Sequence, residues 1–101
     1  MELTTEKNGS ELTVRLNGEL NTLTAPKLST LLDAELGGVE NLTLDFKDCD
    51  YVSSAGLRVL LGTFKQLKAT GGDMRLVNVG EGFMDVLENT GLDGVFDIET
   101  C

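Results

Sequence analysis

The chain has 101 residues, of which 41% are apolar, which is enough for one packed core and one domain over residues 1–101. Seventeen acidic residues against eight basic ones give a net charge of -9, which argues against a nucleic-acid partner and against an anionic membrane surface. The acidity fits solubility alone or a basic protein partner.

The first part of the chain predicts a hairpin followed by a loop and a helix. Thr4–Lys7 and Glu11–Asn17 flank an Asn-Gly pair, which is typical of a β-hairpin. Residues 18–22 are predicted to form a loop. A helix is expected to begin near Thr24 and Pro26 and to end at a Gly-Gly pair, because Pro fits the first helical turn and Gly favours a helix end.

The rest of the chain continues to alternate between strand and helix patterns. Residues 42–46 alternate as in a strand, and Leu57–Leu67 carries an apolar stripe at helical spacing. A strand is predicted over Met74–Val79, a short helix over Phe83–Leu87, and a final short strand or extended tail over Val95–Ile98. This order predicts an α/β fold with a mixed sheet of four or five strands and amphipathic helices packed on it.

Several features bear on the compartment and on cofactors. No apolar run approaches the roughly 20 residues of a membrane span, and the start of the chain does not resemble a signal peptide. We therefore expect a cytoplasmic protein that contacts no membrane. Cys49 and Cys101 are expected to be free thiols, and their spacing matches no metal motif. We expect neither a metal nor a cofactor.

The absence of histidine removes most of the enzyme alternatives. Neither a Ser-His-Asp triad nor a Cys-His pair can form. Asp48 and Asp50 follow a strand and leave a small Mg²⁺-dependent phosphatase as an alternative, although a solvated acidic loop is the favoured interpretation. Residues 80–82 are interpreted as a tight turn into the third helix rather than as a nucleotide site. We therefore expect a non-enzymatic protein.

Two hydroxyls, Ser53 and Ser54, stand where the long helix begins. One of them is expected to be the N-cap, and the other an exposed group that could be modified. A phosphate there would lie beside free backbone N–H groups and the positive end of the helix dipole. Its added charge, about -1.5 to -2 at pH 7, would act on a docked partner and on nearby Asp48 and Asp50 rather than on the fold.

The segment Ser53–Leu57, preceded by an acidic, an aromatic and an aliphatic residue, resembles the STAS domain family. Further matches are Gly18–Asn21 before a helix near Ala25, a Gly-Gly turn before the Met74–Val77 strand, and the tail from Leu87 to Phe96. The resemblance covers essentially the whole chain. It implies a STAS-like mixed sheet of four to five strands with helices packed on one side.

Stand-alone bacterial members of this family are similar to anti-sigma factor antagonists. The resemblance implies that the unphosphorylated chain binds an anti-sigma factor with serine kinase activity and so releases a sigma factor. Phosphorylation would break this complex, and a serine phosphatase would restore it. The phosphorylated residue would be Ser54, with Ser53 as the alternative, and we accordingly expect Ser53 to be the helix cap. The residues implied in partner binding are Glu19, Leu20, Asn21, Thr22, Ser53, Ser54, Ala55, Gly56 and Arg58.

Two positions depart from the family pattern, and one binding alternative stays open. Ser53 and Asn21 stand where the family often has Asp, which keeps a short polar group but changes the charge presented to a partner. The same fold could instead serve as a STAS subunit of a lipid-transport or other signalling complex, without any serine phosphorylation.

Overall fold

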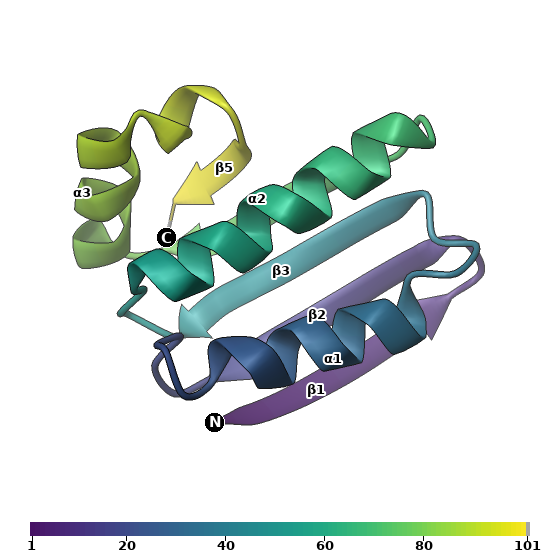
Figure 1. Ribbon diagram of the computed structural model, residues 1–101, viewed down its shortest axis with the longest axis horizontal. Coiled ribbons are helices and arrows are strands. Elements are labelled where there is room, and N and C mark those ends of the chain that lie inside the picture. The colour runs from purple at the N-terminus through teal and green to yellow at the C-terminus, as the bar shows by residue number, and fades with distance from the viewer. Residues whose placement is uncertain (101) are drawn as a thin grey trace.

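Figure 1 shows the computed structural model, which describes residues 1–100. Strands and helices alternate along the chain after an opening hairpin, as the sequence predicts. The elements are β1 (Glu2–Asn8), β2 (Glu11–Asn17), α1 (Ala25–Glu35), β3 (Asn41–Asp48), α2 (Ser54–Ala69), β4 (Asp73–Val79), α3 (Glu81–Thr90), the short 3-10 helix η1 (Leu92–Gly94) and β5 (Asp97–Thr100).

The five strands form one mixed sheet in the order β1-β2-β3-β4-β5. The hairpin strands β1 and β2 are antiparallel, and every other neighbouring pair is parallel. Helices α1 and α2 lie across one face of the sheet, and α3 lies beside β5 (Figure 1). The predicted α/β fold is therefore confirmed, with five strands.

The last strand differs from its prediction by two residues. Val95 and Phe96 were expected to belong to it, whereas β5 begins at Asp97. The backbone N–H groups of Val95 and Phe96 both donate to the Leu92 carbonyl, at 3.0 and 3.1 Å, and so continue the turn of η1. The predicted thiol of Cys101 lies outside the described residues.

The core lies between the helices and the sheet. Leu12, Val14 and Leu16 of β2 are buried at every second position, as a strand with one buried face requires. The ring centroids of Phe83 in α3 and Phe46 in β3 are 4.6 Å apart, and this contact packs the third helix against the sheet. Phe64 of α2 meets Phe96 edge to face at 5.6 Å between ring centroids.

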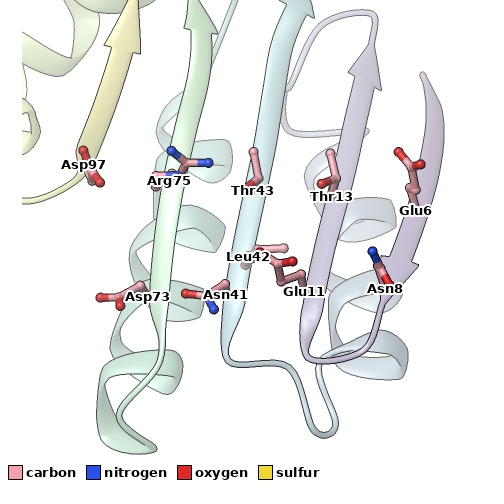
Figure 2. Close-up of a pocket in the computed structure, with 10 residues that line it drawn as sticks. All are labelled: Glu6, Asn8, Glu11, Thr13, Asn41, Leu42, Thr43, Asp73, Arg75 and Asp97. Carbon is pink, nitrogen blue, oxygen red and sulfur yellow. The ribbon is translucent and has the colours of Figure 1, made fainter.

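The opposite face of the sheet is polar. Figure 2 views it with the helices behind, and a shallow hollow there is lined by side chains from all five strands, including Thr13, Thr43 and Arg75. Arg75 pairs with Glu99 across β4 and β5, at 3.4 Å. Such a pattern is typical of a sheet with one face in water.

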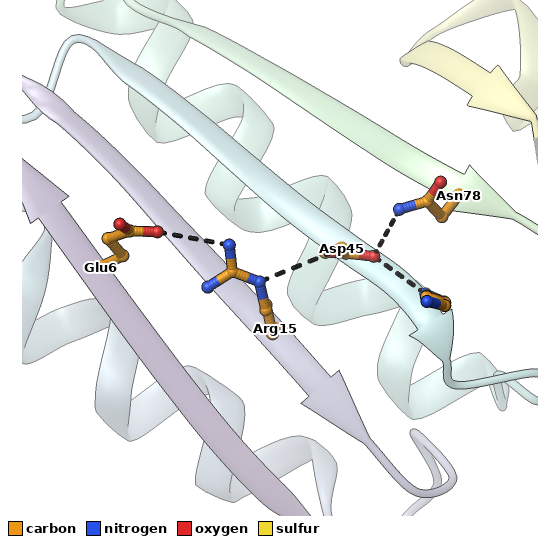
Figure 3. Close-up of polar contacts among 5 residues, drawn as sticks. Glu6, Arg15, Asp45 and Asn78 are labelled. Carbon is orange, nitrogen blue, oxygen red and sulfur yellow. Dashed lines mark hydrogen bonds and ion pairs between the residues drawn. The ribbon is translucent and has the colours of Figure 1, made fainter.

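A short polar network crosses this face between β1 and β4 (Figure 3). Arg15 donates to Glu6 at 3.2 Å and lies 3.8 Å from Asp45, which in turn accepts from Asn78 at 2.9 Å. Asn78 has a φ of +56° at an irregularity in the pairing of β4 with β5. Asn tolerates this left-handed conformation better than most residues, and its amide secures the irregular strand to β3.

Candidate functional site

The candidate site lies where two loops meet at one edge of the sheet. Residues 18–24 follow β2, and residues 49–53 follow β3. Because β2 and β3 are parallel, their carboxyl ends reach the same edge. The two sequence segments implied in partner binding, which are about 30 residues apart, are thereby brought together.

Backbone hydrogen bonds join the two loops directly. The Leu20 N–H donates to the Tyr51 carbonyl at 3.0 Å, and the Ser53 N–H donates to the Leu20 carbonyl at 2.9 Å. Leu20 and Val52 thus form an isolated parallel bridge. The Gly18 N–H adds a bond to the Asp48 carbonyl at 3.0 Å. The loops therefore form one extension of the sheet rather than two independent segments.

Ser53 and Ser54 have different surroundings at the start of α2. Ser53 is the N-cap in extended conformation, and its Oγ accepts from the Gly56 N–H at 3.3 Å. This confirms the prediction that Ser53 caps the helix. Ser54 is the first helical residue and is exposed, whereas Ser53 is half-buried.

Gly56 allows α2 to lie close against the joined loops. A Cβ at this position would lie 2.7 Å from Leu20 Cγ and 2.9 Å from Val52 Cγ2, and both neighbours are buried. Such distances are shorter than real carbon contacts allow. The small residue after Ser54 and Ala55 therefore fixes how closely the helix start approaches the sheet extension.

Asn21 supports the loop from within. Its Oδ1 accepts from the N–H groups of Leu23 and Thr24 at 3.0 and 3.1 Å, and its carbonyl accepts from the Ala25 N–H at 2.8 Å. Thr24 Oγ1 donates to the Glu19 carbonyl at 2.6 Å. Asn21 thus stabilises the turn that leads into α1. The helix itself begins at Ala25 with Thr24 as its N-cap residue, which confirms the start predicted near Thr24 and Pro26.

The predicted binding residues separate into exposed and supporting groups. Leu20 and Gly56 are buried, so in this conformation they hold the surface in place rather than line it. Asn21, Ser53 and Ala55 are half-buried. The exposed members are Glu19, Thr22, Ser54 and Arg58.

Sequence reasoning missed two exposed apolar side chains in the same loops. Leu23 is 83% exposed and Tyr51 is 47% exposed. Tyr51 was noted as the aromatic of the serine motif but was not assigned to the binding set. Neither exposure has a sequence signal, because folded proteins commonly leave some apolar residues exposed.

The thiol of Cys49 lies beneath the acidic loop. Its Sγ donates to the Tyr51 carbonyl at 3.5 Å, and burial raises the pKa of the Cys49 thiol above its usual value. The thiol is therefore neutral at pH 7. Cys49 is unpaired, as predicted, and its buried side chain packs in the core.

Residues 1–100 hold neither a cluster of metal ligands nor a helix that could span a membrane. Nowhere in this range do three or more acidic or cysteine side chains come together as metal ligands would, and Asp48 and Asp50 are both exposed. None of the helices described has the length and apolar character needed to cross a membrane.

Comparison with known families agrees with this architecture. The model of the STAS domain matches residues 2–100, and the chain belongs to the STAS domain family. The anti-sigma-B factor antagonist of Bacillus subtilis is 36% identical over 95 residues, covering 92% of this chain and 85% of that protein. The anti-sigma F factor antagonist of Paenibacillus polymyxa is 28% identical over 100 residues, covering 97% and 86%.

Solved structures show the same fold. A crystal structure of an anti-sigma factor antagonist from Mycobacterium paratuberculosis matches with a TM-score of 0.86 at 25% identity, covering 99% of this chain and 86% of that one. The Bacillus cell fate determinant SpoIIAA in its phosphorylated form matches with a TM-score of 0.77 at 21% identity, covering 99% and 92%. SpoIIAA in its unphosphorylated form matches with a TM-score of 0.73 at 20% identity, covering 93% and 97%.

Proposed function

We propose that this chain is an anti-sigma factor antagonist, a cytoplasmic and non-enzymatic regulator that switches partners. In its unphosphorylated state it binds an anti-sigma factor with serine kinase activity, and the sigma factor is released. The family and the names of its relatives support this role. The observation that carries it is Ser54, an exposed hydroxyl beside a neighbour, Ser53, that already caps the helix.

The switch is a phosphoryl transfer to Ser54. The kinase transfers the γ-phosphoryl group of ATP to Ser54 Oγ, so that a new O–P bond forms, the β–γ bridge bond breaks and ADP leaves. The hydroxyl proton passes to a base of the kinase. A serine phosphatase then hydrolyses the phosphoester with water and restores the hydroxyl.

The position of Ser54 makes the modification compatible with the fold. As the first residue of α2 it lies beside N–H groups that have no partner within the helix, and a phosphate there is favoured by the helix dipole. SpoIIAA, which shares the fold, has been solved in both phosphorylated and unphosphorylated forms. The added charge therefore acts mainly on what docks at this edge.

The experiment is incubation with ATP and the serine-kinase anti-sigma factor of the same organism, followed by peptide mass spectrometry. We expect one added phosphate on Ser54, none on the Ser54→Ala variant, and full modification of the matched Ser53→Ala control. Equal modification of Ser54→Ala and wild type would overturn the assignment.

A further inference from the structure

Two exposed apolar side chains lie in the joined loops that precede Ser54. Within residues 1–100 the exposed large apolar residues are Leu23, Tyr51 and Val95, at 83%, 47% and 41% exposure. Val95 follows η1 and belongs to neither loop. Single exposed apolar residues are ordinary, but two in the loops of one candidate site form a potential contact surface.

The backbone beneath both side chains is fixed. The Leu23 N–H is bonded to Asn21 Oδ1 at 3.0 Å, and the Thr24 hydroxyl closes the same loop onto the Glu19 carbonyl. The Tyr51 carbonyl accepts from the Leu20 N–H at 3.0 Å. A partner that binds these side chains has little backbone left to order, which favours affinity.

The charges around the two side chains restrict the chemistry of the partner. Glu19 and Asp50 are exposed in the same two loops, and Asp48 is exposed at the end of β3. Arg58 stands one helical turn beyond Ser54. Leu23 and Tyr51 are apolar side chains surrounded by carboxylates. A complementary partner surface is an apolar recess bordered by Lys and Arg side chains. The overall charge of -9 is negative like these carboxylates and also favours a basic partner.

We propose that Leu23 and Tyr51 are the apolar anchors by which this edge binds the anti-sigma factor, in an apolar recess bordered by basic side chains. The inference rests on the proposed function and names contact residues that the sequence analysis did not assign.

The anchors also supply a reason for release on phosphorylation. Facing a basic border, a phosphate on Ser54 would by charge alone strengthen binding. Next to an apolar contact that excludes water, the same dianion must lose its hydration, which is costly unless every oxygen finds a partner. The dry contact made by Leu23 and Tyr51 is what turns the added charge into a loss of affinity.

The test is calorimetric titration of the purified serine-kinase anti-sigma factor of the same organism with unphosphorylated variants. Leu23→Ser and Tyr51→Ser should each weaken binding about 10- to 30-fold, as truncation of an interface anchor does. Val95→Ser, the matched control, should stay within about twofold, as a residue outside the interface does. Thermal denaturation should show all three variants folded.

A second measurement combines each anchor variant with Ser54→Asp. If the anchors create the desolvation penalty, the loss of binding caused by Ser54→Asp becomes smaller in the Leu23→Ser background than in wild type. Equal losses in both backgrounds would contradict this coupling.

The possible outcomes separate the inference from the proposed function. If wild type binds no anti-sigma factor, both are overturned. If wild type binds and both serine variants bind equally well, only the anchor assignment is overturned. Dimerisation of wild type that Leu23→Ser abolishes, with anti-sigma factor binding unchanged, would assign the surface to a second copy of this chain and would also overturn the inference.

Discussion

Ser53 and Ser54 differ in what their hydroxyl oxygens do. Ser53 Oγ satisfies the Gly56 N–H, one of the backbone groups that a helix start leaves without a partner. Ser54 is exposed, and its hydroxyl is not the cap. Ser53 therefore stabilises the helix start, and Ser54 is the exposed hydroxyl on which the proposed regulation depends.

We predict that Ser53→Ala lowers the free energy of unfolding by about 1 kcal/mol, because it removes the cap acceptor. Ser54→Ala should change it by less than about 0.5 kcal/mol, as at most exposed positions. Urea denaturation of the two variants measures both values. Ser53→Asp keeps an acceptor and serves as the control, and it should retain the wild-type stability. A larger loss in Ser54→Ala than in Ser53→Ala would reverse the two roles.

The sequence predicted the serine pair but not its surroundings. The cap was predicted at Ser53, and the extended backbone of Ser53 and its bond from the Gly56 N–H confirm it. The turn that Asn21 stabilises and the exposure of Leu23 were missed because both depend on how the loop folds back on itself. Residue types alone do not specify that geometry.

At the scale of elements, the contact between α2 and the joined loops depends on the absence of a side chain at Gly56. Leu20 is fully buried beneath the helix start and cannot move away without opening the core. Gly62, further along the same helix, has no atom within 4 Å of its would-be Cβ apart from its chain neighbours and the adjacent helix backbone. Gly56 and Gly62 therefore allow a crowded and an open position of the same helix to be compared.

We predict opposite effects of alanine at these two glycines. Gly62→Ala should stabilise the protein by about 0.5–1 kcal/mol, the usual gain in a helix interior. Gly56→Ala should destabilise it, because forcing a methyl group against Leu20 and Val52 costs about 1–3 kcal/mol, which exceeds that gain. Thermal and urea unfolding of both variants provide the measurement. Equal stabilisation by the two substitutions would show that the close contact at Gly56 is not limiting.

The elements themselves were largely predictable. Apolar spacing of two residues predicted β2 and β3, and spacing of three to four residues predicted the three α-helices, because each of these has one buried face. The Asn-Gly pair predicted β1, which has no buried residue. The boundary of β5 was wrong by two residues, since η1 continues into Val95 and Phe96. The left-handed Asn78 within β4 had no sequence signal, because its conformation is secured by Asp45 from a neighbouring strand.

At the scale of the whole molecule, the parallel arrangement of β2 and β3 places all parts of the proposed switch at one edge. It brings the loop after each strand to the same place, and α2 starts from there. The backbone of α3 also begins close by, since a Cβ at Gly82 would lie 3.7 Å from the Asp50 carbonyl oxygen. We therefore expect a charge added at Ser54 to change one surface while the sheet and its buried face stay as they are.

The most direct test of this account is the affinity of the chain for the serine-kinase anti-sigma factor before and after phosphorylation of Ser54, with the melting temperature of each form measured alongside. We predict binding that is weaker by about 100-fold after phosphorylation, a typical size for a regulatory coupling, and a nearly unchanged melting temperature. Equal affinity of the two forms, or a loss of binding that accompanies unfolding, would contradict the account.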